Sequence, residues 1–492
     1  MKARSIFAMV CLAAACGGKQ PTAATPEAPV RGRASGAQRA PGPLLGEYAA
    51  TWDERSGILH VAGRFEAGAG ASFLVERGVE RFVRNVASSA DAENAAFAAG
   101  SAEGRRFTFA ACAKTPCRIR YDVALREAAR AIEDLDVASD EGSFVEAPPS
   151  TWLLSPESAD GRARVRFRVK TAEGTRFVTG VFRSKQADDA WDISLDDLWS
   201  APYSAFGPLR VRIVEEGGGL LQLAIAPGRL ARSDDELADW TKSSARAVST
   251  YFAKFPMPEA LVIVAPARGR WVGGGRTLSG GGGTVFMRLG EQASMQALRE
   301  DWVLVHELTH LAFPSVAREH DWAEEGLATY VEPFARVRAG TMRADEAWDA
   351  LTEGLPNGLP RPGDQGLDRT PTWGRRYWGG ALFYFLADIE LRKRSNNGVG
   401  LDHALRGLLA AGGTNATRWS LDDAYRAADR ATGFTVLFDL HAAMGTSPHP
   451  VDLDATLRSL GVGRARGRIV FDDAAPLAAV RRGITYGTVT GR

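Results

Sequence analysis

The chain has 492 residues, of which 45% are hydrophobic and 24% are charged, a composition typical of globular proteins rather than disordered or fibrous ones. Its 60 Lys and Arg residues nearly balance 59 Asp and Glu residues, so a net charge of +1 provides no overall field that would attract nucleic acid. No apolar run reaches the roughly 18 residues of a membrane-spanning helix. The sequence therefore argues against a nucleic-acid-binding protein and against a polytopic membrane protein.

The first residues have the layout of a secretory signal. Lys2 and Arg4 precede a short apolar stretch over residues 6–15, which is too short to span a membrane as a helix. Ala13-Ala14-Ala15-Cys16 resembles the lipobox of bacterial lipoproteins, in which residues 1–15 are removed and Cys16 becomes the lipidated N-terminus. The resemblance implies a lipid-anchored protein of the bacterial cell envelope, periplasmic or facing the surface. The alternative is an ordinary signal peptide with an incidental cysteine.

A β-rich domain is expected over residues 44–205, after a segment, 16–43, whose Ala, Pro and Gly content predicts a flexible tether. In the domain, apolar and polar residues alternate, as at Ile119, Tyr121 and Val123. Such runs between turn residues predict antiparallel strands with one face in water, hence a β-sandwich or a saddle-like sheet. One helix around residues 125–135 interrupts it. No cluster of reactive side chains is evident, which favours a packing or substrate-presenting role.

Two cysteines, Cys112 and Cys117, remain beyond Cys16. In an oxidising envelope compartment, a pair this close in the sequence is expected to form a disulfide that closes a loop. Two cysteines alone cannot fill the four-coordinate shell of zinc. We therefore predict a disulfide rather than a metal site.

After residue 206 the pattern predicts a small mixed sheet followed by helices. A hairpin over 209–214 and 220–225, a helix that begins after Ser233, and strands over 261–264 and 284–289 build the sheet region. From about residue 291 almost everything is expected to be helical. We divide this part into residues 206–320, residues 321–465 and a C-terminal tail, 466–492. The predicted fold class is α+β, with the β-rich domain first.

The sequence His306-Glu307-Leu308-Thr309-His310 predicts a zinc site. Two histidines four residues apart lie on one face of a helix, where both imidazoles can bind the same Zn²⁺. Glu307 lies about 100° around the helix, within reach of a metal-bound water rather than of the metal. We therefore expect His306 and His310 as ligands of a single zinc and Glu307 as the general base.

A catalytic zinc needs a third protein ligand. Phe313 and Val316 stand where metzincins carry glycine and histidine, which excludes that class. Residues 322–329 instead resemble the second motif of the gluzincins, peptidases of clan MA, in which a tryptophan is followed after two residues by Glu-Gly. The resemblance implies that Glu325 is the third ligand. His320 remains the alternative.

Two neighbouring residues complete the expectations for this segment. Glu324 is expected next to the ligands or in solvent, and Thr329 is a candidate to orient a ligating histidine. Both expectations depend on how the helix that carries Glu325 is turned.

A tyrosine motif follows further along the chain. In aminopeptidases of this clan, a tyrosine two residues before Lys-Gly hydrogen-bonds the oxyanion. Tyr377 occupies that place, although Gly379 replaces the lysine. The resemblance implies that the Tyr377 phenol stabilises the charge that develops on the oxyanion during peptide hydrolysis. Tyr330 and Tyr384 are expected in the core.

Residues 380–392 and 401–406 resemble the glycyl aminopeptidase family, which implies a thermolysin-like catalytic domain after the β-rich domain and a peptide or protein substrate. Two features depart from that family. The family's Gly-Gly-x-Glu segment, whose acid binds the substrate's amine, corresponds here to a glycine-rich stretch that has Arg276 and no acid, and no PDZ domain follows residue 460. The glycines of this stretch are expected to let the backbone approach an extended substrate, namely Gly273, Gly274, Gly281 and Gly282.

The function that the sequence predicts is zinc-dependent peptide hydrolysis, with Glu307 activating the water. Two alternatives remain open: an inactive envelope protein that uses a protease fold for binding or assembly, and a zinc hydrolase of a non-peptide substrate. An intact Glu307 argues against the first. Because no acid is available for a substrate amine, we expect cleavage without a requirement for a free N-terminus.

Overall fold

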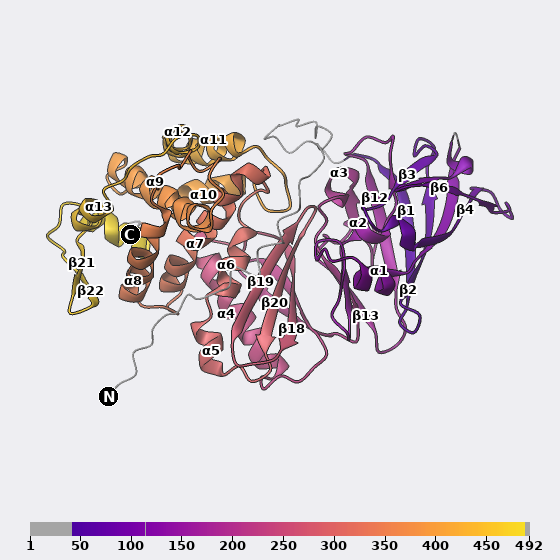
Figure 1. The fold of residues 1–492 in the computed structure, drawn as a ribbon, viewed down its shortest axis with the longest axis horizontal. Coiled ribbons are helices and arrows are strands. Elements are labelled where there is room, and N and C mark those ends of the chain that lie inside the picture. The colour runs from indigo at the N-terminus through magenta and orange to yellow at the C-terminus, as the bar shows by residue number, and fades with distance from the viewer. Residues whose placement is uncertain (1–41, 114, 488–492) are drawn as a thin grey trace.

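The computed structural model describes residues 42–113 and 115–487. The predicted signal peptide, Cys16 and the tether up to residue 41 lie outside these residues. Along the long axis of the molecule, a β-rich domain, a central sheet and a helical region follow one another in chain order (Figure 1). Within the described ranges, no helix has both the length and the apolar character needed to cross a membrane.

Three sheets form the β-rich domain, in the orders β14-β12-β1-β2-β8-β4-β5, β13-β15-β10-β9 and β11-β3-β7-β6. The strands are β1 (Leu44–Asp53), β2 (Ile58–Phe65), β3 (Ser72–Leu74), β4 (Val83–Ala90), β5 (Ala98–Ala99), β6 (Ser101–Glu103), β7 (Arg106–Thr108), β8 (Cys117–Val123), β9 (Ser139–Asp140), β10 (Val145–Ala147), β11 (Ser155–Pro156), β12 (Arg164–Lys170), β13 (Arg176–Thr179), β14 (Trp191–Ser194) and β15 (Ser204–Gly207). The helices are η1 (Glu80–Phe82), η2 (Ala110–Cys112), α1 (Leu125–Ala131), α2 (Pro149–Trp152) and α3 (Leu195–Leu198).

The predicted alternation is confirmed. Strand β8 buries Ile119, Tyr121 and Val123, while the residues between them reach the surface or lie close to it. Every strand pairing in this domain is antiparallel except that of β1 with β12, which is parallel. The helix expected around residues 125–135 is present as the shorter α1.

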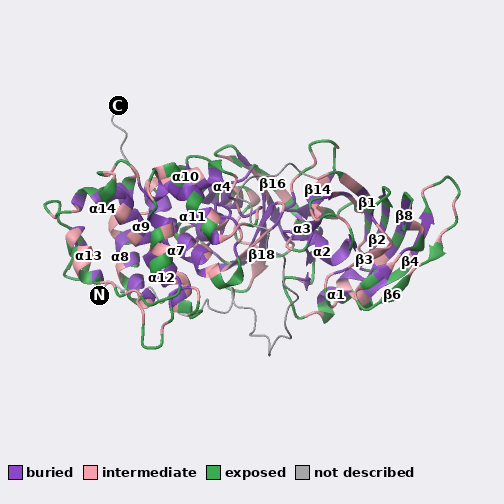
Figure 2. Cartoon of the chain, turned by 90° about the horizontal axis from the view of Figure 1, so that it is seen from above, coloured by how far each residue is buried: buried purple, intermediate pink, exposed green. Residues whose placement is uncertain are grey.

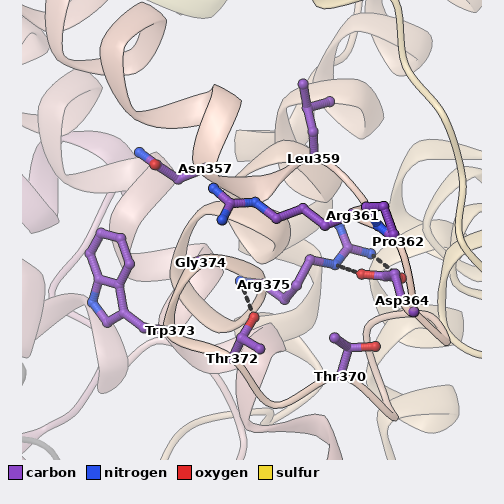
Figure 3. Close-up of a pocket in the computed structure, with 11 residues that line it drawn as sticks. Asn357, Leu359, Arg361, Pro362, Asp364, Thr370, Thr372, Trp373, Gly374 and Arg375 are labelled. Carbon is purple, nitrogen blue, oxygen red and sulfur yellow. Dashed lines mark hydrogen bonds and ion pairs between the residues drawn. The ribbon is translucent and has the colours of Figure 1, made fainter.

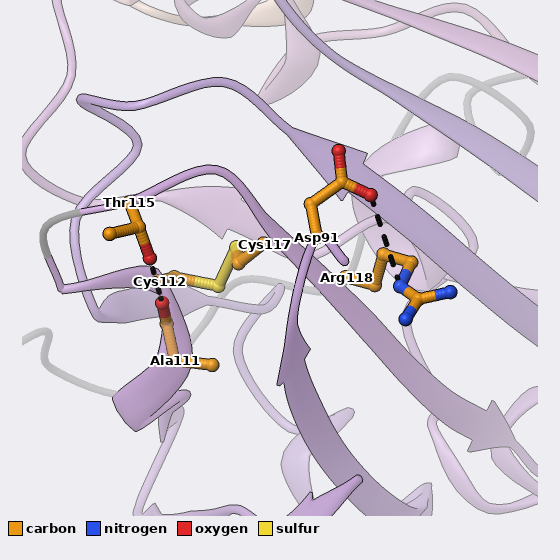
Figure 4. Close-up of a disulfide and its surroundings, with 6 residues drawn as sticks. All are labelled: Asp91, Ala111, Cys112, Thr115, Cys117 and Arg118. Carbon is orange, nitrogen blue, oxygen red and sulfur yellow. Dashed lines mark hydrogen bonds and ion pairs between the residues drawn. A yellow bond between two sulfur atoms is a disulfide. The ribbon is translucent and has the colours of Figure 1, made fainter. Parts of the chain in front are cut away.

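Cys112 and Cys117 form a disulfide that joins η2 to the start of β8 (Figure 4). The Cα atoms are 5.0 Å apart, and both side chains are buried in the core of the domain. The disulfide lies in the β-rich domain and contributes no group to the site described below.

The central sheet has the order β16-β17-β18-β20-β19, with β16 (Arg210–Glu216), β17 (Gly219–Ile225), β18 (Glu259–Ala267), β19 (Val272–Ser279) and β20 (Gly283–Gly290). Its three inner strands are parallel and its two outer strands antiparallel, so the prediction of a mixed sheet is confirmed. Helix α4 (Asp234–Phe252), which begins with a capping box between Ser233 and Glu236, covers one face. The other face packs against the β-rich domain (Figure 2), where Leu261 and Phe286 contact a cluster that includes Phe144.

The rest of the described chain is mostly helical. It comprises α5 (Met295–Glu300), α6 (Val303–His310), η3 (Arg318–His320), α7 (Asp321–Arg338), α8 (Ala344–Gly354), η4 (Leu355–Gly358), η5 (Gly374–Gly379), α9 (Gly380–Arg394), α10 (Leu401–Ala410), α11 (Leu421–Thr432), α12 (Val436–Met444), α13 (Leu453–Ser459), β21 (Val462–Ala465), β22 (Arg468–Phe471) and α14 (Ala478–Tyr486).

The expectation of a C-terminal tail from residue 466 is wrong for the residues that the structure describes. A β21–β22 hairpin and helix α14 pack onto the helical region instead. Ile484 is buried, and the guanidinium of Arg338 donates a hydrogen bond to its carbonyl oxygen over 2.9 Å. The apolar stripe of α14 is only two turns long, which is too short to stand out as a periodic pattern.

A buried ion network explains why residues 388–406 form a recognisable motif. The Arg392 side chain is fully buried and lies 2.8 Å from Asp388 and 3.3 Å from Asp402. Asp388 also accepts the backbone N–H of Leu401 over 2.9 Å, at the start of α10. These residues join α9 to α10, so their role is structural: buried charges are retained only where they are paired.

Helix α7 crosses the start of α9 with backbone against backbone. A Cβ atom at Gly326 would lie 2.3 Å from the Cα of Gly380, and a Cβ at Gly380 would lie 2.2 Å from the carbonyl oxygen of Trp322. Real Cβ contacts are much longer, so only glycine allows this approach. The crossing therefore fixes the depth and rotation of α7 directly beside Glu325.

We predict that Gly326→Ala destabilises the protein, because the added methyl group must push α7 away from α9. Overpacking of this kind costs about 1–3 kcal/mol, which thermal unfolding followed by circular dichroism would record as a Tm several degrees lower. Gly463→Ala is the matched control, because its Cβ would meet only the Val470 side chain, at 3.7 Å. Equal Tm values for the two variants would contradict the tight crossing.

Candidate metal centre

Helix α6 presents the first two candidate ligands. Asp301 fixes the start of the helix, since its carboxylate accepts the backbone N–H groups of Val303 and Leu304 over 2.9 and 3.1 Å. The helix is buried against the central sheet and α7. One turn apart on its inner face, His306 and His310 point the same way, with their rings 4.9 Å apart.

Glu325, on α7, completes the cluster that the sequence predicted. Its Oε2 lies 3.3 Å from Nε2 of His306 and 3.5 Å from Nε2 of His310. Two ligands that each bind a tetrahedral zinc at about 2.1 Å are about 3.4 Å apart, so both spacings fit one zinc ion. Two imidazoles and one carboxylate are also a donor set of catalytic zinc sites. The three side chains are at most 11% exposed.

The charges in the cluster favour a cation. Burial by itself would lower the pKa of His310, but its hydrogen bond to Glu325 and the nearby carboxylates raise that pKa to about 9. Burial opposes ionisation of Glu325 as well, yet the two histidines hold its pKa well below the usual range. Without metal, a proton on His310 compensates the Glu325 charge. A divalent metal ion would take the place of that proton.

Glu307 is held beside the cluster by a residue that the sequence did not single out. Glu307 is 3% exposed, and its carboxylate accepts a hydrogen bond of 2.7 Å from the hydroxyl of Thr277 on β19. The same hydroxyl is 3.1 Å from the backbone oxygen of Glu307. A Cβ at Gly275 would lie 2.6 Å from the Glu307 carboxylate, so a glycine is required there. No sequence pattern marks Thr277, because only the packing of β19 on α6 brings it to Glu307.

The glycines predicted to bind substrate divide into two pairs. Gly273 and Gly274 lie in a bulge of edge strand β19, which packs against α6, and Gly274 has a φ of +64°. The structure corrects the expectation for Gly281 and Gly282. Gly281 exchanges backbone hydrogen bonds with Ala416 and Phe182, and Gly282 forms a β-bridge with Val181. The backbone N–H and C=O of Gly281 are thus engaged, and the bridge holds Gly282 against the β-rich domain.

Tyr377 lies beside the cluster, next to His306. It sits in η5, a π-helical turn, a conformation that is frequent at functional sites. Its ring stacks on that of His306 with the centroids 6.4 Å apart. The neighbouring Arg376 forms an ion pair of 2.8 Å with Asp321 and lies 3.9 Å from Oε1 of Glu325. The expectation that the other two tyrosines belong to the core is confirmed for both Tyr330 and Tyr384.

The alternative and accessory residues have other partners. His320 is 2.8 Å from Asp368 and does not belong to the cluster of His306, His310 and Glu325. Glu324 accepts the backbone N–H of Val316 over 3.0 Å, which closes the short connection between α6 and α7. Thr329 donates its hydroxyl hydrogen bond to the carbonyl oxygen of Glu325 over 2.8 Å, so the idea that it orients a histidine is wrong.

A pocket of about 520 Å³ adjoins the turn that carries Tyr377 (Figure 3). An ion pair of 2.8 Å between Arg375 and Asp364 forms part of its wall, and the side chain of Arg361 extends across it. Trp373, 44% exposed, also lines the pocket, and its ring stacks on Tyr377 at 6.1 Å. The pocket is therefore linked to the cluster through two stacked rings.

Comparison with solved structures identifies the fold. No family model and no curated protein matches the sequence. An aminopeptidase N family protein from Idiomarina loihiensis superimposes with a TM-score of 0.63 at 14% identity, over 85% of this chain and 78% of that one. The M1 zinc metallopeptidase from Deinococcus radiodurans, solved as a mutant bound to a Tyr-Ser-Ala substrate, gives a TM-score of 0.52 at 13% identity, over 84% of this chain and 96% of that one. The chain therefore has the fold of M1 zinc metallopeptidases.

We predict that replacing His306, His310 or Glu325 with alanine abolishes zinc binding by this cluster, because each variant leaves only two of the three candidate ligands. Glu307→Gln is the matched control: it keeps the size of a buried neighbour that is not a ligand, so it should keep the zinc. Equilibrium dialysis followed by elemental analysis measures both. Normal zinc content in Glu325→Ala would exclude that residue as the third ligand.

Proposed function

We propose that the protein is a zinc-dependent metallopeptidase whose His306, His310 and Glu325 hold one Zn²⁺. The observation that carries this proposal is the position of Glu307. It is a buried carboxylate beside the ligand cluster but outside it, held by a threonine hydroxyl on a neighbouring strand. Burying an extra carboxylate is costly, and a binding module would have no need for it. The M1 metallopeptidase fold supports the same conclusion.

The chain's own residues have separable roles in this proposal. When bound, zinc would supply a Lewis acid that polarises a carbonyl group and lowers the pKa of water. Glu307 takes the proton from the attacking water and passes it to the leaving amine. The hydrogen bond from Thr277 fixes the orientation of the Glu307 carboxylate. Tyr377 donates its phenolic hydrogen bond to the oxygen on which negative charge develops.

An extended peptide is the substrate shape that the site suits. Strand β19 lies at the edge of the central sheet beside α6, and an edge strand can pair with an extended segment. In the bulge of β19, Gly275 brings backbone without a side chain beside Glu307, since a Cβ there would lie 2.6 Å from the Glu307 carboxylate. The pocket at Trp373 offers space for one substrate residue on the Tyr377 side. Peptides or unfolded protein segments are accordingly the proposed substrates.

The proposed location is the bacterial cell envelope, through a lipid on Cys16. It is supported by the lipobox-like residues 13–16 and by a disulfide, which persists in oxidising compartments. Membrane contact would then come from the lipid, and the globular part would face the aqueous phase.

We predict that Glu307→Gln abolishes hydrolysis of a broad peptide library while zinc content stays at the wild-type level. Thr277→Val should lower kcat by about ten- to a hundredfold, since a hydrogen bond to a charged group contributes about 1.5–3 kcal/mol. Thr277→Ser keeps the hydroxyl and should restore most of the rate. Wild-type kcat in Thr277→Val would remove Thr277 from the positioning of the base. A zinc-loaded wild-type protein without turnover of any peptide would favour the inactive binding module.

The acids near the site already have partners, and this determines whether the site can bind the charged N-terminus of a substrate. Arg276 forms an ion pair with the buried Glu146 of the β-rich domain, and its guanidinium lies over the ring of Phe286 on β20. Asp321 pairs with Arg376, and Glu324 accepts a backbone hydrogen bond. Each of the three acids, Glu146, Asp321 and Glu324, thus already has a partner other than a substrate ammonium, so a free amine would remain unpaired.

We therefore predict that matched peptides with free and acetylated N-termini are cleaved with similar kcat/KM. The measurement compares initial rates for several such pairs at one enzyme concentration. A preference of more than tenfold for the free amine, which corresponds to about 1.4 kcal/mol, would reveal an amine-binding group. Glu146→Gln then tests whether that group is Glu146.

A further inference from the structure

A second group of metal-ligating side chains lies outside the site described above. It consists of His320 at the end of η3, Asp368 in the segment before η5, and His441 on α12. Nδ1 of His320 is 2.8 Å from Oδ1 of Asp368, and Nε2 of His441 is 3.1 Å from Oδ2 and 3.4 Å from Oδ1 of the same carboxylate. All three side chains are half-buried.

The central carboxylate is held rigidly. The backbone N–H of Asp368 bonds to the carbonyl oxygen of Gly445 over 2.9 Å, just after α12. The indole N–H of Trp322 donates to Oδ1 of Asp368 over 2.8 Å. A Cβ at Gly445 would lie 2.7 Å from Oδ2, so glycine permits the close approach of this segment. Ligands fixed by hydrogen bonds to their surroundings are a feature of metal sites.

His441 contacts a second carboxylate through its other ring nitrogen. Nδ1 of His441 lies 3.5 Å from Asp422, while Nε2 faces Asp368. A carboxylate that orients the far nitrogen of a histidine is the usual outer partner of a metal ligand. The chain has only seven histidines, and two of them, 121 positions apart, meet here. Chance clustering of so rare a residue around one carboxylate is uncommon.

We propose that His320, Asp368 and His441 bind a second divalent metal ion of the zinc type, with water in the fourth coordination position. The distances of 2.8 Å from His320 and 3.1 Å from His441 to Asp368 are those of hydrogen bonds. Two ligands of one tetrahedral zinc ion lie about 3.4 Å apart, so zinc binding would lengthen the His320–Asp368 distance to about that value. The ion would join α12 and the segment before η5 to the start of α7. Because Glu325 follows His320 by five residues, this ion would hold the helix that presents the third ligand of the first site.

The test is the metal stoichiometry of the full chain, measured by elemental analysis after zinc loading and dialysis against metal-free buffer. We expect two zinc ions in the wild type and one in His306→Ala, which leaves the second cluster untouched and therefore avoids any folding defect there. Asp368→Asn and His441→Ala should also retain one, and the double variant His306→Ala/His441→Ala none. His60→Ala, which removes a surface histidine that is 2.7 Å from Asp122, is the control and should retain two.

Two outcomes would overturn the proposal: one zinc in the wild type with none in His306→Ala, or two zinc ions in a folded His441→Ala. If instead the proposed zinc site of His306, His310 and Glu325 does not bind metal, the result is distinguishable, because His306→Ala would keep all the metal and His441→Ala would lose it. Cobalt substitution in His306→Ala gives an independent readout. Visible absorption bands that disappear in His306→Ala/His441→Ala would place the ion at this cluster.

Discussion

A carboxylate held between two imidazoles is the interaction on which the rest of the structure depends. Glu325 lies within 3.5 Å of both His306 and His310, and all three side chains are almost fully buried. Burying these groups is unfavourable unless each one finds its partners. Two helices that are separate in the sequence must therefore meet at one point, with the correct faces toward each other. The packing around α6 and α7 holds the two helices in this position.

Three contacts supply that precision. The glycine crossing of α7 and α9 sets the depth of Glu325, and the carboxylate of Asp301 sets where α6 begins. The hydroxyl of Thr277 ties the edge of the central sheet to Glu307. Each contact acts within one or two residues of a group that is proposed to act in catalysis. Since a displacement of about 1 Å can cost a hundredfold in rate, such local ties matter more than the bulk of the core.

The β-rich domain joins the same arrangement through its interface with the central sheet. Apolar residues of both parts share one cluster, and the ion pair of Arg276 with Glu146 crosses the interface beside it. In this pair, Glu146 compensates the positive charge of Arg276, the charged residue of the glycine-rich segment. Burial raises the pKa of Glu146 to about 7, even though the positive charge of Arg276 opposes that shift. Proteins with the M1 metallopeptidase fold share the architecture at 14% identity, but a fold alone does not determine the substrate.

The sequence by itself determined the features that depend on local periodicity and on short motifs. Alternation predicted strands such as β8, and the capping residues predicted α4. The resemblance of residues 322–329 to the second gluzincin motif pointed to Glu325 rather than His320 as the neighbour of the two histidines. The tertiary structure decided the rest. Thr277 reaches Glu307 across 30 residues of sequence, and Asp368 joins His320 to His441, because strand, helix and loop are brought together only by packing. The roles of the glycines divided for the same reason: a glycine's role depends on which backbone approaches it, and no local pattern contains that information.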